Sequence, residues 1–392
     1  MLTADLATAL TRRSIRVTWM AAASSAVRSR APSAPAQPTP QVRRIRIDMP
    51  EAPAPPVNWQ VRENTVADAI ISALRDLPSI DVIHLTHFSR SGLEFLDRPP
   101  ICNVPTVATL TDYTAVCGDY QLVHRQTGNR CGPPVLAETC AACVGARSTH
   151  QVSAQNLEMW RRRNLSFFSG RCRALWMQTP HQRLQMRNAG LRDDHVISDH
   201  AAYAIPLDWR SRPPSADQPT FLFLGRASAE KGLHVLLQAF MAWRKVARLV
   251  VCSAADDTAY EDGLRRVAST DMRIDWRDPV PRNDLVELLN DAHALVVPSQ
   301  WEDNHPMVMQ YALALGVPVL CSGVASLMHL AGQDGLFTVD RYWDVARWTS
   351  AFEGLISQSQ IPFPDRLAET RRAYDAHVDS VVRCYRLLAG AA

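Results

Sequence analysis

Two positively charged side chains, Arg226 and Lys231, lie in the segment GRASAEKG at residues 225–232. The segment follows the apolar run at 220–224 and precedes a run with helical spacing, so it is expected to join a buried strand to a helix. Gly225 would permit a tight turn there. Backbone donors and the dipole at a helix N-terminus add to side-chain charge, an arrangement that suits a diphosphate. The alternative is a solvated loop with two ordinary surface cations.

A second polar cluster, WEDNH at residues 301–305, follows the apolar run at 294–297 and precedes Pro306. The spacing predicts a strand, the cluster, a helix that begins at the proline, and a further strand after Gly316. The cluster would then lie at the carboxyl edge of a parallel sheet, where open α/β folds bind their ligands. A carboxylate at that edge can accept hydrogen bonds from hydroxyl groups and stabilise developing positive charge.

Both segments resemble glycosyltransferase family 4, through FLGRASAEKGLHVLLQAF at 223–240 and PSQWEDNHPMVMQYALALGVPV at 298–319. The resemblance implies a GT-B architecture, an α/β fold of two doubly wound Rossmann-like domains that face a cleft. It also implies that Gly225, Arg226 and Lys231 bind a nucleotide-sugar donor. In the family the two cations contact the diphosphate and stabilise it as it leaves, without a metal ion, so no catalytic metal is expected.

The acidic motif departs from the family at both glutamate positions. Alignment on the later Gly-Val-Pro-Val places Asp303 at the first glutamate, where it would meet the sugar as the catalytic carboxylate, with Asn304 beside it fitting the donor pattern. Tyr311 stands at the second, where the family's glutamate accepts from both ribose hydroxyls. Losing that charge-assisted bond would cost roughly 1.5–3 kcal/mol and weaken donor binding about ten- to a hundredfold. The alternative for Tyr311 is a core-facing aromatic side chain on a helix.

The first half of the chain resembles the family more loosely, through apolar runs at 80–88 and 107–113. The family's second such strand usually ends in His-Asp, whereas this chain has Thr111 followed by an aspartate. Thr111 can donate a hydrogen bond but cannot act as an imidazole does. His84 and His87 are expected to be packing or loop histidines.

The family normally opens with a strand and a Gly-Gly loop that meets the phosphates and the acceptor. Residues 6–19 (LATALTRRSIRVTW) instead read like the helix and second strand that follow this loop. The N-terminal domain is therefore expected to lack its first strand, through true loss or through a misplaced start codon. In-frame upstream sequence that encodes a strand and a Gly-Gly pair would support the second explanation.

Four of the nine cysteines, Cys117, Cys131, Cys140 and Cys143, lie within one segment, separated by thirteen, eight and two residues. A Cys-x-x-Cys pair with two further cysteines suggests a structural zinc site that closes a long loop. A similar insert occurs in some family 4 enzymes directly after the corresponding strand. Free thiols, or disulfides in a secreted protein, are the alternatives.

Strands alternate with helices along the rest of the chain, which predicts βαβ units and mostly parallel sheets. The expected helices lie at 2–13, 65–77, 92–96, 181–189, 233–246, 260–267, 283–290 and 364–388. The expected strands lie at 15–19, 80–86, 106–110, 174–178, 220–224, 248–252, 272–276 and 294–297.

Composition divides the chain further. Pro-rich patches at 31–40 and 50–56 are expected to be surface loops or linkers, and 209–218 a linker between domains. This predicts an acceptor-side domain at 1–210 with a Cys-rich insert at 114–146, and a donor domain at 218–360. A last helix at 361–392 would pack back across the domains.

The 392 residues are 47% apolar and 21% charged, as in an ordinary globular protein, and are enough for two cores. A net charge of +3 is too small to suggest nucleic acid as a partner. The longest apolar runs have strand length, so no transmembrane helix is expected. Residues 17–27 only loosely mimic a signal peptide, and the scattered cysteines fit a cytoplasmic protein.

The chain is therefore expected to be a retaining glycosyltransferase of glycan or glycoconjugate synthesis, with a nucleotide-sugar donor. The acceptor could be a glycan, a lipid-linked molecule or a small molecule. A basic, aromatic stretch at 160–173 could touch anionic lipid as a peripheral membrane contact, or be a solvated helix face. The alternative function is a catalytically impaired relative that binds a sugar nucleotide or a partner without turnover.

Overall fold

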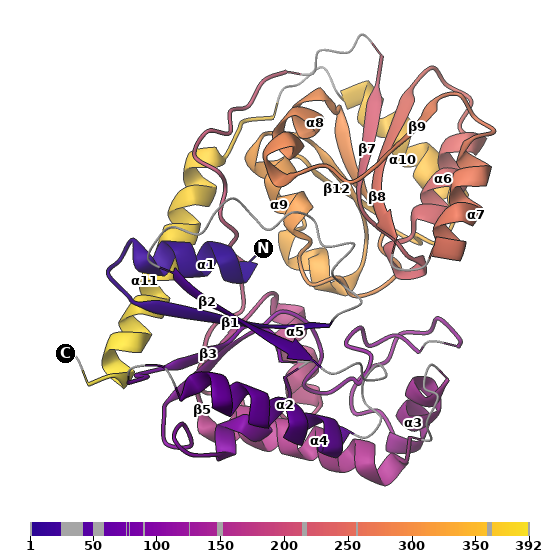
Figure 1. Cartoon of the computed structure of the whole chain (residues 1–392). Helices are drawn as coiled ribbons and strands as arrows, with labels where there is room; N and C mark the ends of the chain where they lie inside the picture. The colour runs from indigo at the N-terminus through magenta and orange to yellow at the C-terminus, as the bar shows by residue number, and fades with distance from the viewer. Residues whose placement is uncertain are drawn as a thin grey trace. The chain divides into compact units, whose positions relative to one another are not determined.

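The computed structural model describes residues 2–24, 42–49, 59–75, 77, 79–88, 91–124, 126–146, 152–213, 218–255, 258–358 and 363–390. The chain forms two compact units, a first unit of Met1–Ala202 with Asp375–Ala392 and a second unit of Tyr203–Tyr374 (Figure 1). The Pro-rich patches at 31–40 and 50–56 lie outside the described residues.

The first unit contains two separate parallel sheets in its described part. One sheet pairs β1 (Val17–Ser24) with β2 (Val42–Met49) along their whole length. The other has four strands in sequence order, β3 (Ile83–Leu85), β4 (Thr106–Leu110), β5 (Cys172–Met177) and β6 (Val196–Ser198). The strand expected at 106–110 is present at those residues, and those expected at 15–19, 80–86 and 174–178 are present with shifted ends. The described strands do not form one continuous sheet.

Helices of the first unit cover these sheets and supply its core. They are α1 (Leu2–Thr11), α2 (Trp59–Leu74), α3 (Ala137–Gly145), α4 (Ala154–Ser166) and α5 (Pro180–Asn188). The side chains of Thr179 and Ser153 cap α5 and α4, each accepting a hydrogen bond from a first-turn backbone amide. Phe88 and Phe168 pack together in the core between the four-stranded sheet and its helices.

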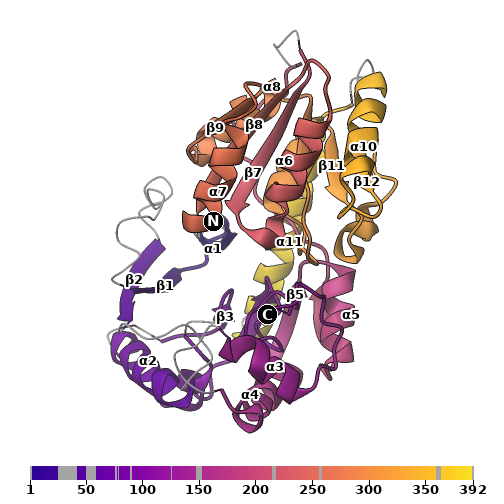
Figure 2. The ribbon, with the colours of Figure 1, turned by 90° about the vertical axis from the view of Figure 1, so that its right-hand side faces the viewer.

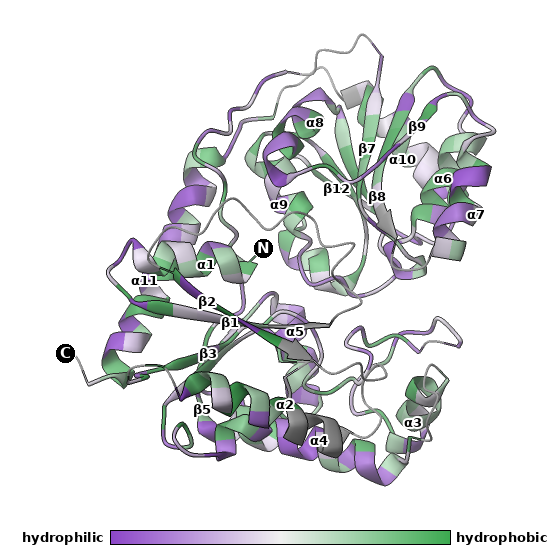
Figure 3. Ribbon diagram, viewed as in Figure 1, coloured by the Kyte–Doolittle hydropathy of each residue, from purple (hydrophilic) through white to green (hydrophobic). Residues whose placement is uncertain are grey.

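The second unit is a doubly wound parallel sheet of six strands in the order β12-β11-β10-β7-β8-β9. The strands are β7 (Thr220–Ala227), β8 (Arg248–Ala255), β9 (Ile274–Arg277), β10 (Ala294–Val297), β11 (Val319–Ser322) and β12 (Leu336–Val339). Buried apolar residues fill β7, β10 and β11, because helices cover both faces of the sheet. Figure 3 shows this hydrophobic character along β7 and β8.

Five helices flank this sheet, α6 (Leu233–Ala242), α7 (Thr258–Ala268), α8 (Leu285–Asp291), α9 (Met307–Ala314) and α10 (Val345–Gln358). Figure 1 shows α6, α7 and α10 on one side of the sheet and α8 and α9 on the other. Four aromatic rings pack together where α6 and α10 meet the sheet, those of Phe221, Phe240, Trp243 and Phe352. The strand β12 and the helix α10 are elements that the apolar spacing did not predict.

The last helix, α11 (Leu367–Leu388), contributes its first residues to the second unit and its last residues to the first. Within the first unit, the hydroxyl of Tyr385 lies 2.6 Å from His84 Nδ1, and Asp375 and Asp379 pair with Arg13 after α1. These contacts tie the end of α11 to β3 and α1.

Candidate functional site

The strand order of the second unit reverses at β7, which has β8 on one side and β10 on the other. The chain moves outward from β7 through β8 to β9, and then crosses back to β10. The carboxyl ends of β7 and β10 therefore flank a topological switch point, where doubly wound sheets bind ligands. The two polar segments of the sequence lie at these ends, since 225–232 begins in the last residues of β7 and 298–305 follows β10.

The tight turn of the phosphate loop lies at Gly232 rather than at Gly225. Gly225 is inside β7, paired with Ser253 of β8, and its φ is not positive. Gly232 precedes α6 in the left-handed region, with φ at 72°. A Cβ atom on Gly232 would lie 1.9 Å from the carbonyl oxygen of Pro298, so only glycine fits. This close approach brings the phosphate loop against the loop that follows β10.

The central contact of the site is an ion pair between these two loops. Lys231 Nζ lies 2.5 Å from Asp303 Oδ2, and the hydroxyl of Ser299 donates to the same oxygen at 3.0 Å. The Asp303 side chain is 8% exposed and that of Lys231 is 20% exposed. The ammonium group also lies 5.5 Å from the ring centroid of Trp301. The structure thus brings together a predicted diphosphate cation and the predicted sugar carboxylate, with Ser299 as a support that the sequence did not reveal.

The second predicted cation, Arg226, lies at the exposed end of β7. Its guanidinium is 3.6 Å from Glu230, a carboxylate of the same loop, and its side chain is 35% exposed. Glu230 also accepts, through its backbone oxygen, a hydrogen bond from the amide of Gln300. Arg226 and Lys231 are therefore each held beside a carboxylate at the switch point.

The acidic segment itself is buried and internally braced. Glu302 accepts a hydrogen bond at 2.7 Å from the backbone amide of Ser326. His305 has φ at 51°, and its carbonyl oxygen accepts a hydrogen bond at 2.9 Å from the hydroxyl of Tyr203. Burial raises the pKa of Tyr203, and the neighbouring Asp303 raises it further. Asn304 is also buried. Glu302 therefore braces the loop, while Asp303 faces Lys231.

Further polar atoms along the same sheet edge are buried without a hydrogen-bond partner within the described chain. They are the hydroxyl groups of Ser228, Ser253 and Ser322 and the indole nitrogen of Trp301, which lie within three residues of the end of a strand or in the loop after it. An unsatisfied buried polar atom costs about 1–3 kcal/mol, so each such atom calls for a partner such as a water molecule or a ligand. Their position supports a ligand site at the carboxyl edge.

Tyr311 lies in the core of the second unit, on α9. It is 1% exposed, its hydroxyl donates to the sulfur of Met307 at 2.9 Å, and its ring packs edge-on against Trp209 with centroids 5.0 Å apart. The guanidinium of Arg282 lies 5.5 Å from the ring centroid. This is the environment of a core-facing aromatic residue, and a contact between Tyr311 and a ribose remains a prediction.

In the first unit, Thr111 and Asp112 are the two residues that directly follow β4. One carboxylate oxygen of Asp112 accepts from the amide of Thr114 at 2.8 Å, and the other lies 3.5 Å from His87 Nε2. His84 is a partly buried packing residue, stacked on Trp176 and hydrogen-bonded through Nε2 to Thr109. Burial lowers the pKa of His84 to about 3, so its ring is neutral at physiological pH.

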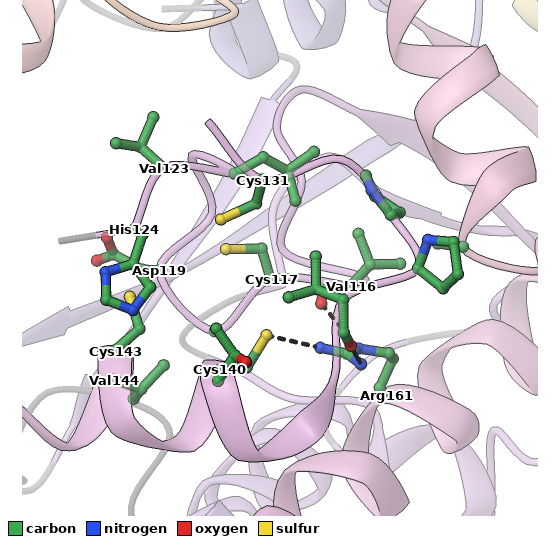
Figure 4. A pocket seen from close by; sticks show the side chains of 17 residues that line it. Val116, Cys117, Asp119, Val123, His124, Cys131, Cys140, Cys143, Val144 and Arg161 are labelled. Carbon is green, nitrogen blue, oxygen red and sulfur yellow. Dashed lines mark hydrogen bonds between the residues drawn. The ribbon is translucent and has the colours of Figure 1, made fainter. Parts of the chain in front are cut away.

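The four clustered cysteines line one pocket of about 50 Å³ (Figure 4). Contrary to the expected irregular loop, Cys140 and Cys143 lie on α3, while Cys117 and Cys131 come from the loop before it. Arg161 reaches into the cluster, donating to the Cys140 sulfur at 3.1 Å and to two backbone oxygens. Burial raises the pKa of Cys117 to about 12 and that of Cys131 to about 11.

Metal binding at this pocket stays a prediction. Within the ranges that the structure describes, no three His, Cys, Asp or Glu side chains are arranged to hold a metal ion. Zinc binds cysteines as thiolates, and in the structure the sulfur of Cys140 instead accepts a hydrogen bond from Arg161.

The basic, aromatic stretch turns its aromatic rings inward. Trp160, Phe167 and Phe168 are all buried, whereas Arg162 has a side chain that is 79% exposed. No helix in the described part of the chain has the length and apolar character needed to cross a bilayer.

Comparison with known proteins agrees with this geometry. Residues 218–358 match the family model described as glycosyl transferases group 1. An uncharacterised glycosyltransferase of Methanocaldococcus jannaschii is 26% identical over 157 residues, which cover 37% of this chain. The match spans 40% of that relative's length.

Solved structures resemble nearly the whole chain. Sucrose-phosphate synthase from Thermosynechococcus elongatus gives a TM-score of 0.73 at 16% identity, covering 99% of this chain and 92% of the other. HepE of Anabaena, in complex with UDP-glucose, gives 0.59 at 13% identity, covering 89% and 85%. The chain thus has the GT-B glycosyltransferase fold, and the expected α/β architecture is confirmed.

Proposed function

We propose that this chain is a glycosyltransferase that moves a sugar from a nucleotide diphosphate donor to an acceptor, with retention at the anomeric carbon. The observation that carries the proposal is the 2.5 Å pair between Lys231 and Asp303 at the switch point of the second unit. The match of this unit to group 1 glycosyl transferases supports it, and so does the UDP-glucose bound by the structurally similar HepE.

The leaving diphosphate would be neutralised by Arg226 and Lys231. Arg226 lies at the end of β7, and Lys231 lies two residues before α6, where the dipole of the helix adds to the charge of the lysine. A leaving group that carries negative charge is stabilised most by donors fixed in place before the reaction. Gly232, pressed against Pro298, fixes the position of Lys231 relative to the acidic loop.

The sugar would be met by Asp303. Its carboxylate can accept hydrogen bonds from sugar hydroxyls and stabilise the positive charge that develops on the sugar ring as the diphosphate departs. In the structure Lys231 and Ser299 satisfy one oxygen of this carboxylate. A bound donor would place its phosphates beside Lys231, so the lysine would bridge the phosphate and Asp303.

Calorimetric titration with a panel of nucleotide sugars that includes UDP-glucose tests the donor site. We expect at least one donor to bind, and Lys231→Met to weaken it about ten- to a hundredfold through loss of a charge-assisted hydrogen bond. Lys245→Met is a matched control, because Lys245 is the chain's other lysine and is exposed. Absence of binding by every donor would reject the proposal.

NMR would test retention, because it reports the configuration at the anomeric carbon. The sample would be the transfer product, or the sugar released when the donor is slowly hydrolysed. An inverted product would overturn this part of the proposal while leaving donor binding intact. The acceptor, whether glycan, lipid-linked or small molecule, would be sought among substrates that accelerate donor consumption.

The second candidate is a sugar-nucleotide binding protein without turnover. It is favoured by Tyr311, whose hydroxyl contacts Met307 in the core. Binding of a donor without transfer or hydrolysis would support it, whereas turnover with any acceptor would reject it.

Two further expectations remain proposals. Structural zinc would be detected by metal analysis of the purified chain and lost in Cys131→Ser, with Cys384→Ser, outside the pocket, as control. Peripheral contact with anionic lipid would rest on arginines alone, since the nearby rings are buried, and vesicle sedimentation at increasing salt would test it.

A further inference from the structure

The acidic loop at residues 298–305, which carries Asp303, ends in an uncommon backbone conformation. His305 has φ at 51°, in the left-handed region that residues other than glycine adopt only rarely. Such a conformation persists where the surrounding structure holds it in place. The amide of His305 also donates to the carbonyl oxygen of Asp303 at 2.9 Å. The backbone at His305 therefore helps to fix the direction of the residue that would meet the sugar.

Tyr203 contacts this conformation from outside the loop. It is the first residue of the second unit, and its hydroxyl donates to the carbonyl oxygen of His305 at 2.9 Å. The backbone amide of Tyr203 donates to Gln310 Oε1, on α9, at 3.1 Å. Tyr203 thus joins the end of the acidic loop to the helix that follows it.

The contact between Tyr203 and His305 is buried. Each residue is 7% exposed, and their rings meet edge-on with centroids 5.9 Å apart. The ring of His329, in the short helix after β11, lies against the ring of His305 with centroids 5.7 Å apart. Because the hydrogen bond is buried, removal of the hydroxyl would leave the carbonyl oxygen of His305 without this donor, which disfavours the observed backbone conformation.

Asp303 lies between two anchors of the loop. On one side, the carboxylate of Glu302 accepts a hydrogen bond from the amide of Ser326. On the other side, Tyr203 donates to His305. Burial and the charge of Asp303 raise the pKa of Tyr203, so its phenol stays protonated and remains a donor at physiological pH. Because this donor binds a backbone oxygen, Tyr203 acts on Asp303 through the loop rather than on a ligand.

We propose that Tyr203 is a positioning residue of the donor site, whose hydroxyl holds His305 in the left-handed conformation and so keeps Asp303 directed toward the donor sugar. The proposal rests on the role of Asp303 in the proposed function. Arg226 and Lys231, which would bind the diphosphate, lie on the other loop of the site. Loss of the hydroxyl should therefore slow turnover and leave the affinity for a nucleoside diphosphate nearly unchanged.

The first test compares Tyr203→Phe with the unchanged chain. We expect kcat in a donor-consumption assay to fall about tenfold or more, and Kd for UDP in calorimetry to change less than about threefold. Tyr385→Phe is the matched control, because its partly buried hydroxyl also has a hydrogen-bond partner, His84 Nδ1 at 2.6 Å, but belongs to the first unit. This control should leave both constants unchanged. An unaltered kcat in Tyr203→Phe would overturn the proposal.

Two backgrounds separate positioning from a general loss of stability. His305→Ala removes the imidazole ring but keeps a Cβ in the left-handed region, whereas His305→Gly removes the ring and lets the backbone adopt that region freely. We expect Tyr203→Phe to lower kcat about tenfold when combined with His305→Ala, and less than about twofold when combined with His305→Gly. An equal effect in both backgrounds would mean that Tyr203 supports the second unit in general, and would overturn the proposal.

Amide hydrogen exchange tests the proposal without turnover. In Tyr203→Phe the amides of Asp303 and His305, which donate within the loop, should exchange about tenfold faster. Exchange in α10, which packs against α6 and β12, should not change (Figure 2). Absence of donor consumption by the unchanged chain would reject the proposed function, whereas unchanged exchange in the loop would overturn the role of Tyr203.

Discussion

At the scale of single residues, the carboxylate of Asp303 has two roles, because it pairs with Lys231 and would also contact the donor sugar. In the structure it neutralises Lys231, whereas the proposed reaction needs Lys231 for the diphosphate and Asp303 for the sugar. Asp303 and the phosphates of a donor would therefore compete for Lys231. A substitution at Asp303 can test this competition.

We expect Asp303→Asn to affect product binding and turnover in opposite directions. Without its carboxylate partner, Lys231 offers its full charge to a phosphate, so a nucleoside diphosphate such as UDP should bind up to about tenfold more tightly. Turnover of the donor should fall at least about a hundredfold, because the positive charge on the sugar loses its partner. Calorimetry with UDP and a donor-consumption assay measure the two effects.

Asp278→Asn is the control and should change neither UDP binding nor turnover. The Asp278 side chain is 93% exposed and lies 3.5 Å from Arg265 at the protein surface. Weaker UDP binding by Asp303→Asn would mean that the carboxylate orders the lysine rather than competes for it.

Tyr311 gives a second prediction at this scale. Its hydroxyl donates to the sulfur of Met307 within the core, so Tyr311→Phe should lower the free energy of unfolding by no more than about 1 kcal/mol and leave donor affinity unchanged. Urea unfolding and calorimetry give the two values. A loss of donor affinity of about tenfold or more would show that the phenol reaches the ribose.

At the scale of elements, the site depends on how two loops approach each other. The left-handed Gly232 ends the phosphate loop, begins α6 and touches the loop after β10. A side chain there would push apart Lys231 and Asp303. The geometry of the ion pair is therefore set by a residue that carries no functional group.

Gly232→Ala should destabilise the second unit by about 2 kcal/mol or more and abolish donor binding. The new Cβ would lie 1.9 Å from Pro298 oxygen and would occupy a left-handed conformation. Gly263→Ala is the matched control, because a Cβ on that glycine of α7 meets no atom within 4 Å. It should be neutral or stabilise by up to about 1 kcal/mol. Equal effects of the two variants on urea unfolding would contradict this account.

The sequence located most elements, and the misses have physical reasons. The strands β4 and β10 lie at the expected residues, since continuous apolar runs with clear turn signals mark buried strands. The helix α3 was missed because cysteines and alanines carry little amphipathic contrast. The turn was expected at Gly225 because local spacing does not show which glycine approaches another chain segment.

At the scale of the whole molecule, partly buried histidines in both units link stability to pH. Burial lowers the pKa of four of them, His84, His234, His293 and His377, and that of His84 to about 3. A histidine with a lowered folded pKa binds its proton only in the unfolded state between the two pKa values. Its stabilising effect is therefore complete above pH 6.5 and is lost as the pH falls toward the folded pKa.

We expect the free energy of unfolding to fall as the pH decreases below 6.5, with His84 alone contributing up to about 1.4 kcal/mol per pH unit down to about pH 3. Urea titrations between pH 8 and pH 5 measure the slope. His84→Phe should reduce this slope, whatever its effect on stability at pH 8. A slope that is unchanged in the variant would show that His84 titrates normally in the folded protein.

The sequence by itself determined the alternating α/β pattern and the types of residue at the candidate site, because these follow from local spacing and from chemical identity. Only the tertiary structure decided that Lys231 meets Asp303 seventy-two positions away, that Glu302 binds a backbone amide, and that Tyr311 turns into the core. It also decided that the described strands of the first unit form two separate sheets. These features depend on which strands become neighbours, and strand order arises from packing of the whole chain rather than from any one segment.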